Sequence, residues 1–337
     1  MMPTRSISLK RGSRHSISVV LPVLNEAESL SKLLPQLADT LAQTDMDWEI
    51  VIVNDGGTDN LDEVVAAFER NRVYSNVQLL RLSRNFGKEA ALTAGLTAAR
   101  GDAVICMDGD GQHPVTMIPL LISYWREGDD MVVPVPESRA HEPRWLAWAK
   151  RSFYRFMQSG ERFEIPPSAG DFRLMDRRVV NALLQLPERA RFMKGLYAWL
   201  GFRSRLVPFE VQERMAGSTK FPLRRLVELA SLGVTSFSMK PLRFVSGVGA
   251  LISLGALSYG VYIMVETLIV GNPVSGWATL ASGIMLLSGI QLLCLGVIAE
   301  YLGRLFEEAK QRPLYVLDEC TDHSRLGQSE PVMKAAR

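Results

Sequence analysis

The chain has 337 residues, of which 47% are hydrophobic and 22% charged. This composition excludes a disordered or collagen-like protein and leaves room for one large domain plus a smaller one. Its 38 basic and 36 acidic residues give a net charge of +2, so the overall charge gives no indication of a nucleic-acid partner. Three scattered cysteines are too few for a disulfide framework or a zinc site, and they favour a reducing compartment.

Residues 1–16 form a basic segment that no apolar stretch follows, so we predict a flexible tail rather than a signal peptide. After it, short apolar runs alternate with helical patterns, and residues 17–220 are predicted to form one α/β domain. Near-continuous apolar strands separated by helices are typical of a Rossmann-like, mostly parallel sheet that is covered on both faces. The predicted strands are 17–23, 48–53, 77–82, 103–107 and 131–135.

Polar clusters follow the first four of these strands. They are Asn25-Glu26, Asn54-Asp55, Arg84-Asn85 and Asp108-Gly-Asp110. Because ligands of an open α/β sheet bind beyond the carboxyl ends of its strands, the clusters predict one binding site along that edge.

The segment Asp108-Gly-Asp110-Gly-Gln112 is a candidate metal and phosphate site. Two carboxylates and an amide oxygen suit a hard cation such as Mg²⁺ or Mn²⁺, which completes its shell with water and substrate phosphate. The alternative is a solvated turn. The sequence has neither a P-loop motif nor a glycine-rich dinucleotide fingerprint, which argues against a P-loop NTPase and a dinucleotide oxidoreductase.

Three other places leave alternatives open. Asp55, at a strand end, can accept a hydrogen bond from a base or a ribose hydroxyl, or it can cap a helix. Gly170-Asp-Phe-Arg173, taken alone, is more typical of the start of a helix than of a site. Arg214 and Lys220 can bracket a phosphate, or they can supply only positive charge beside a membrane.

Two uncharged stretches, 244–265 and 267–299, are each long enough for a membrane-spanning helix. We predict two transmembrane helices within 242–303, joined by a turn at 271–273, and an amphipathic interfacial helix over 221–241. A buried helical hairpin of a soluble protein is the alternative. Lys and Arg flank both spans and are missing from the turn, so the catalytic domain, the segment 304–337 and both termini are expected in the cytoplasm.

Several motifs occur in a fixed order. They are Leu21-Pro-Val-Leu-Asn-Glu26, Val53-Asn-Asp-Gly-Gly-Thr-Asp59, Arg84-Asn-Phe-Gly87, Met107-Asp-Gly-Asp-Gly-Gln-His-Pro114, Ala169-Gly-Asp-Phe-Arg-Leu-Met-Asp176 and Gly217-Ser-Thr-Lys220. With the two-span tail, this order closely resembles the family 2 glycosyltransferases that load sugars onto polyprenyl phosphate, such as bactoprenol glucosyltransferases and dolichyl-phosphate mannose synthases. The resemblance covers about residues 17–317.

The resemblance implies a GT-A fold, a nucleotide-diphosphate sugar donor such as UDP-glucose or another UDP-hexose, and an undecaprenyl phosphate acceptor at the inner membrane of a bacterium. It implies that the nucleotide is bound by Pro22, Asn25, Glu26, Asp55, Arg84 and Asp108. It implies that Mg²⁺ or Mn²⁺ is held by Asp108, Asp110 and Gln112. It implies that phosphate or acceptor is bound by Arg214, Ser218 and Lys220, and that the catalytic carboxylate is Asp171. It also suggests a homo-oligomer.

Three residues depart from the pattern of the family. Asn54 stands where relatives usually have Asp, Gly57 where they have Ser, and His113 where Asp is frequent. The Gln-x-x-Arg-Trp signature of processive synthases is missing, which favours transfer of one sugar per acceptor. Attack of the acceptor phosphate on the anomeric carbon, with UDP leaving from the opposite face, is expected to invert the configuration. The alternatives are a transferase acting on another lipid, such as diacylglycerol, and an idle nucleotide-sugar-binding membrane protein.

Overall fold

The computed structural model describes residues 15–70, 76–136, 170–189, 191–209 and 276–326, together with isolated residues between 245 and 269. The chain divides into two compact units. One unit contains Met1–Phe221 together with Pro313–Arg337, and the other contains Pro222–Arg312.

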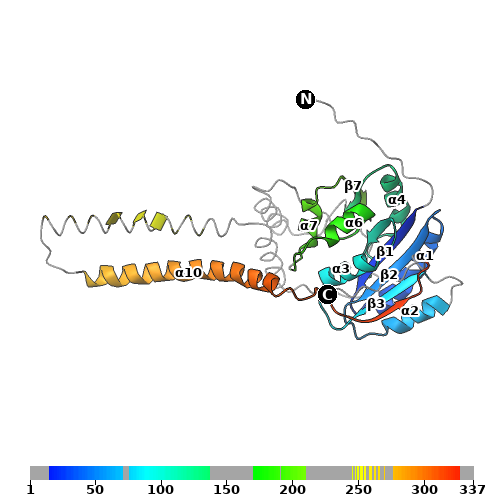
Figure 1. Cartoon of the computed structure of the whole chain (residues 1–337), viewed down its shortest axis with the longest axis horizontal. Helices are drawn as coiled ribbons and strands as arrows, with labels where there is room; N and C mark the ends of the chain where they lie inside the picture. Colours follow the sequence, from blue (N-terminus) through cyan, green and yellow to red (C-terminus); the bar gives the residue numbers. More distant parts are fainter. Residues whose placement is uncertain are drawn as a thin grey trace, which may run out of the picture. The chain divides into compact units, whose positions relative to one another are not determined.

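The first unit is built on one sheet, in which the described residues form eight strands in the order β7-β5-β6-β4-β1-β2-β3-β8 (Figure 1). The strands are β1 (Ser16–Val23), β2 (Asp47–Asn54), β3 (Val77–Leu82), β4 (Ala103–Cys106), β5 (Met131–Pro136), β6 (Arg173–Asp176), β7 (Ser204–Phe209) and β8 (Leu317–Asp322). Strand β1 pairs in parallel with both β2 and β4, and β3 continues the parallel run beyond β2. The predicted mostly parallel α/β sheet is thus confirmed, and its first five strands lie where the apolar runs placed them.

Helices cover both faces of this sheet. They are α1 (Ala27–Ala42), α2 (Leu61–Arg70), α3 (Lys88–Ala98), a 3-10 helix η1 (Val115–Met117), α4 (Ile118–Arg126), α6 (Arg177–Leu184) and α7 (Met193–Trp199). Leucines at helical spacing in α1, such as Leu30, Leu34 and Leu37, are fully buried against one face. On the other face α3 lies so close that a side chain at Gly95 would come 2.3 Å from Val20.

Strand β8 was not predicted, because its sequence, LDECTD, is polar and mostly exposed. It follows the second unit in the chain yet pairs antiparallel with β3 at the edge of the sheet (Figure 1). The turn after it is held by the buried carboxylate of Glu49, which accepts a hydrogen bond of 2.6 Å from the Ser324 hydroxyl. The same carboxylate also accepts hydrogen bonds from Gln78 and from the amide of Arg100.

The described part of the second unit is mainly α10 (Trp277–Ala309), a helix of 33 residues. Several of its large apolar side chains are exposed, among them Leu280, Ile284 and Leu292. Within the part of the chain that the structure describes, no helix combines the length and apolar content that crossing a membrane requires. The predicted helix over 221–241 lies outside the described residues, as does half of the first predicted span, 244–265.

Candidate active site

The loops that follow β2 and β3 are fastened together by Asp55. Its carboxylate oxygens accept hydrogen bonds from the backbone amides of Phe86, at 2.7 Å, and Gly87, at 2.9 Å. Burial raises the pKa of Asp55, and the two amide hydrogen bonds oppose that rise. Gly56 has φ +71°, and a side chain there would meet the Arg84 backbone at 2.4 Å. Asp55 therefore caps no helix of its own, but fixes the shape of the strand-end loops.

Two asparagines hold the turn after β2, Asn54 from within the turn and Asn25 from the loop after β1. The Asn25 side-chain oxygen accepts a hydrogen bond of 2.8 Å from the Thr58 amide, and that of Asn54 accepts one of 2.7 Å from the Gly57 amide. An amide oxygen serves this purpose as well as a carboxylate oxygen. The departure at Asn54 thus keeps the acceptor that the turn uses.

Three further predicted nucleotide-binding residues lie at the same edge. Pro22 is buried near the end of β1, paired with Val53 of β2. Glu26 directly precedes α1, and its carboxylate lies so close to Gly109 that a side chain there would come within 2.8 Å of Oε2. Arg84 is exposed, with its guanidinium 4.1 Å from the centre of the Phe86 ring. The structure therefore brings Glu26 next to the Asp108–Gln112 turn.

Lys88, which the sequence analysis did not single out, forms ion pairs with both Asp108 and Asp171. Its Nζ lies 2.6 Å from Asp108 Oδ1 and 2.8 Å from Asp171 Oδ2. Burial opposes the charge of Lys88, but Asp171 and then Asp108 raise its pKa above the ordinary value. Burial likewise opposes the charge of Asp171, but Lys88 lowers its pKa below the ordinary value. Both partners are therefore charged at neutral pH. The signal that could have found Lys88 is its place directly after the Arg84–Gly87 motif.

Sheet topology explains why Asp171 meets Asp108. Strand β6 runs antiparallel to β4, with Arg173 opposite Cys106. The residues that precede β6 therefore lie beside those that follow β4. The alternative that Gly170–Arg173 begins a helix is wrong, because Arg173 opens a strand whose hydrogen-bonded neighbour is β4.

His113, the third departure from the family pattern, ties these two segments together. Its ring stacks on Phe172 with centroids 4.6 Å apart, and its Nδ1 accepts a hydrogen bond of 3.1 Å from the Asp108 amide. Burial lowers the pKa of His113, which keeps Nδ1 available as an acceptor at neutral pH. The histidine thus holds Asp108 and Asp171 in register.

The predicted metal ligands lie in one tight turn. The backbone amide of Gln112 donates a hydrogen bond of 3.0 Å to Asp110 Oδ1, and Gly111 takes φ +76°. The described residues contain no group of three or more His, Cys, Asp or Glu side chains that could hold a metal. Hard oxygen donors on one or two carboxylates, completed by substrate phosphate, nevertheless suit Mg²⁺ or Mn²⁺. Asp108, Asp110 and Gln112 supply oxygen donors of this kind within one turn, so their chemistry fits the group, and a cation there would share Asp108 with the Lys88 ammonium, which lies 2.6 Å from Asp108 Oδ1.

The predicted phosphate ligands Arg214, Ser218 and Lys220 lie outside the described residues.

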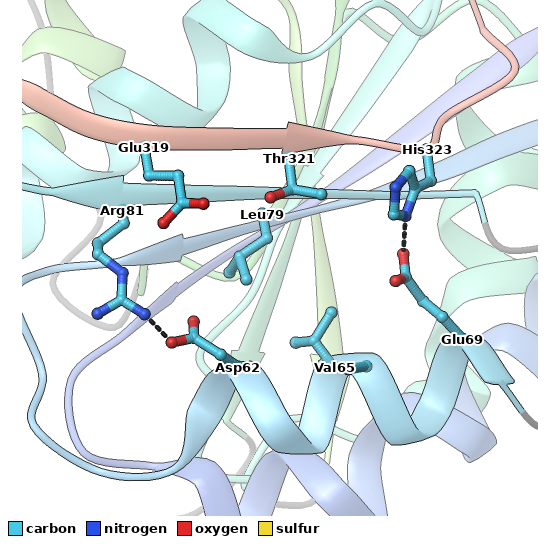
Figure 2. A pocket seen from close by; sticks show the side chains of 9 residues that line it. Asp62, Val65, Glu69, Leu79, Arg81, Glu319, Thr321 and His323 are labelled. Atoms are coloured by element: carbon cyan, nitrogen blue, oxygen red, sulfur yellow. Dashed lines mark hydrogen bonds and ion pairs between the residues drawn. The ribbon is translucent and has the colours of Figure 1, made fainter.

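A separate cavity of about 330 Å³ lies between α2 and the β3–β8 edge (Figure 2). Its apolar floor includes Val65 and Leu79, and the pair His323–Glu69, at 2.7 Å, closes one end. Arg81 and Asp62 pair at the other end. None of the predicted site residues lines this cavity, so it is distinct from the candidate active site.

Residues 18–184 match the family described as glycosyl transferase family 2, and residues 240–305 match the GtrB C-terminal hairpin. The uncharacterized glycosyltransferase sll0501 of Synechocystis is 43% identical over 304 residues, 90% of this chain and 95% of that protein. The bactoprenol glucosyl transferase of Shigella phage SfV is 39% identical over 301 residues, 89% of this chain and 97% of that protein. Among solved structures, glucosyl-3-phosphoglycerate synthase of Mycobacterium tuberculosis, crystallised with Mn²⁺ and UDP-glucose, is 20% identical, with a TM-score of 0.44. The match covers 66% of this chain and 78% of that chain.

Proposed function

Because this chain belongs to the family 2 glycosyltransferases, we propose that it transfers one sugar from a nucleotide-diphosphate sugar to a polyprenyl phosphate, with inversion at the anomeric carbon. The donor is UDP-glucose or another UDP-hexose, and the acceptor is undecaprenyl phosphate. The observation that carries the proposal is the match to bactoprenol glucosyl transferases, which extends over 97% of the length of the phage protein.

The strand-end loops support the proposed donor site. Asp55 fixes the loop that presents Arg84, and Asn25 and Asn54 fix the turn beside it. A nucleotide bound by preformed loops loses less free energy to ordering on binding. Arg84 is exposed at this edge, where its guanidinium can meet a phosphate.

Asp108, Asp110 and Gln112 would hold the divalent cation. When bound, the cation would neutralise negative charge that develops on the departing diphosphate. The Lys88 ammonium lies at the same carboxylate and adds a fixed positive charge on the side of Asp171.

Asp171 is proposed to orient the reactants rather than to remove a proton. The acceptor phosphate has a second pKa near ~6, so its attacking oxygen is mostly ionised at neutral pH. The pairing with Lys88, which lowers the pKa of Asp171, makes this carboxylate a weak base. Both facts favour a role in holding the acceptor or the sugar in line.

We also propose that the segment 242–303 spans the bacterial inner membrane twice, that the amphipathic 221–241 segment lies at its inner surface, and that the protein is a homo-oligomer. The two uncharged stretches and the match to a C-terminal hairpin support this placement. A polyprenyl phosphate cannot leave the bilayer, so its transferase must work at the membrane surface. Arg214, Ser218 and Lys220 are proposed to bind the phosphate of the acceptor there.

The test is transfer by the full-length protein in detergent, with labelled UDP-hexoses and undecaprenyl phosphate, in the presence of Mn²⁺, Mg²⁺ or EDTA. We expect a lipid-linked product that requires the cation. A diacylglycerol acceptor in parallel tests the other lipid. Binding of UDP without turnover of any donor would overturn the proposal in favour of an idle nucleotide-sugar-binding protein.

A further inference from the structure

Glu89, the second residue of α3, lies beside the Lys88 bridge but takes no part in it. Its Oε2 atom is inaccessible to solvent and has no hydrogen-bond partner among the described residues, and the same is true of Asp171 Oδ1. The carboxyl group of Glu89 accepts a hydrogen bond from the backbone amide of Met193, at the start of α7. Glu89 thus connects α7 to the active-site end of α3.

Several charged and titratable groups from three parts of the chain lie near Glu89. Those that interact with it electrostatically are Lys88 on its own helix, Asp171 before β6, and Arg191, Lys194 and Tyr197 in or just before α7. Burial, and then the charge of Asp171, raise the pKa of Glu89 to about 8, although Lys88 and Lys194 oppose the rise. At neutral pH most Glu89 side chains therefore carry a proton.

We propose that Glu89 is a positioning residue that works as a neutral carboxylic acid beside Asp171. In that form it leaves Lys88 to pair with Asp108 and Asp171 alone. Ionised, it would compete for the Lys88 ammonium and add negative charge where the anionic donor and acceptor must approach. This inference rests on the proposed function, because the phosphates of its substrates are the anions concerned.

The test compares kcat/KM for the sugar donor from about pH 6 to about pH 9.5 in wild type, Glu89→Gln and the exposed α2 control Glu63→Gln. Gln is isosteric with the protonated acid, so we expect Glu89→Gln to stay within about threefold of wild type near pH 7. Wild type and Glu63→Gln should lose activity above about pH 8, approaching about tenfold per pH unit, and Glu89→Gln should not. The same alkaline loss in Glu89→Gln, or its inactivation at neutral pH while folded, would overturn the inference.

Two further measurements keep the inference testable if Glu89→Gln is unstable or if no transfer is found. Lys194→Met removes a charge that favours ionised Glu89, so the alkaline loss should move to higher pH. The second measurement is the Tm as a function of pH. Glu89 has its ordinary pKa of 4.5 in the unfolded chain and a pKa of about 8 in the folded protein. Stability is therefore lost as pH rises through that window. The difference in Tm between Glu89→Gln and wild type should therefore grow in favour of the variant between about pH 4.5 and about pH 8, and stay constant above that range. A difference in Tm that does not change with pH would contradict the proposed protonation of Glu89, even in a protein without transfer activity.

Discussion

At the scale of single residues, Lys88 decides what Asp171 can do. A carboxylate that pairs with an ammonium at 2.8 Å is stabilised in its charged form, and the side chain of Asp171 is only 15% exposed, which limits the screening of this attraction by water. The same ammonium contacts Asp108, so the proposed metal ligand and the proposed catalytic carboxylate share one cation. Loss of either acid therefore changes the electrostatics of the other.

We expect Asp171→Asn to keep more activity than Asp110→Ala. Asparagine retains the shape that orients a reactant, whereas the alanine variant loses an oxygen ligand of the cation, at a cost of about 100-fold or more in kcat. The measurement is the initial transfer rate of both variants at saturating Mn²⁺, with the exposed Asp45→Asn as control. Equal and complete loss in both variants at every pH between about pH 6 and about pH 8.5 would mean that Asp171 is an essential base.

At the scale of elements, β8 shows how the end of the chain is fastened to the sheet. Its pairing with β3 covers a strand edge that would otherwise be open. A buried carboxylate is stable only where its oxygens are hydrogen-bonded. Glu49 meets this need with donors from Ser18 of β1, Gln78 of β3 and the backbone amide of Arg100, two residues after α3. The fourth donor, Ser324, follows β8.

Removing that fourth donor should loosen β8. Ser324→Ala leaves Glu49 with one hydrogen bond fewer, and we expect the free energy of unfolding to fall by about 1–3 kcal/mol. Ser123→Ala, on the exposed face of α4, is the matched control. Thermal melts together with hydrogen exchange at the amides of β8 would measure the change. An unchanged Tm and unchanged exchange would show that the contact contributes nothing to docking.

At the scale of the whole molecule, the proposed function requires the sheet unit to face the cytoplasm. The chain leaves that unit at about residue 221, passes through the segment proposed to span the membrane, and returns to the same sheet through β8. A segment that crosses a bilayer twice returns to the side from which it started. The pairing of β8 with β3 is therefore compatible with two spans and incompatible with one.

Exposed Cys320 on β8 offers a test of this topology, since Cys106 is buried. A membrane-impermeant maleimide should label Cys320 in inside-out vesicles but not in intact spheroplasts. Cys320→Ser should remove the label, which separates it from any reaction of Cys294. Labelling of Cys320 in intact spheroplasts, or release of the protein from membranes by high salt, would contradict the proposed placement.

The sequence by itself determined the central sheet. Strands β1 to β5 are short, mostly buried apolar runs, and such runs are visible without knowledge of their partners. It also placed Asn25, Asp55 and Asp108 at one edge, because parallel strands all end on the same side. The ordered motifs indicated the family, which the relatives confirm.

Only the tertiary structure decided how those residues are used. Strands β6 and β8 are short or polar, and each exists because it pairs with a strand distant in the sequence. The antiparallel pairing of β6 with β4 brings Asp171 to Asp108, and Lys88 then meets both from the start of α3. Local patterns report which residues are buried, whereas the hydrogen bonds and charge pairs of a site depend on contacts between segments that no local pattern contains.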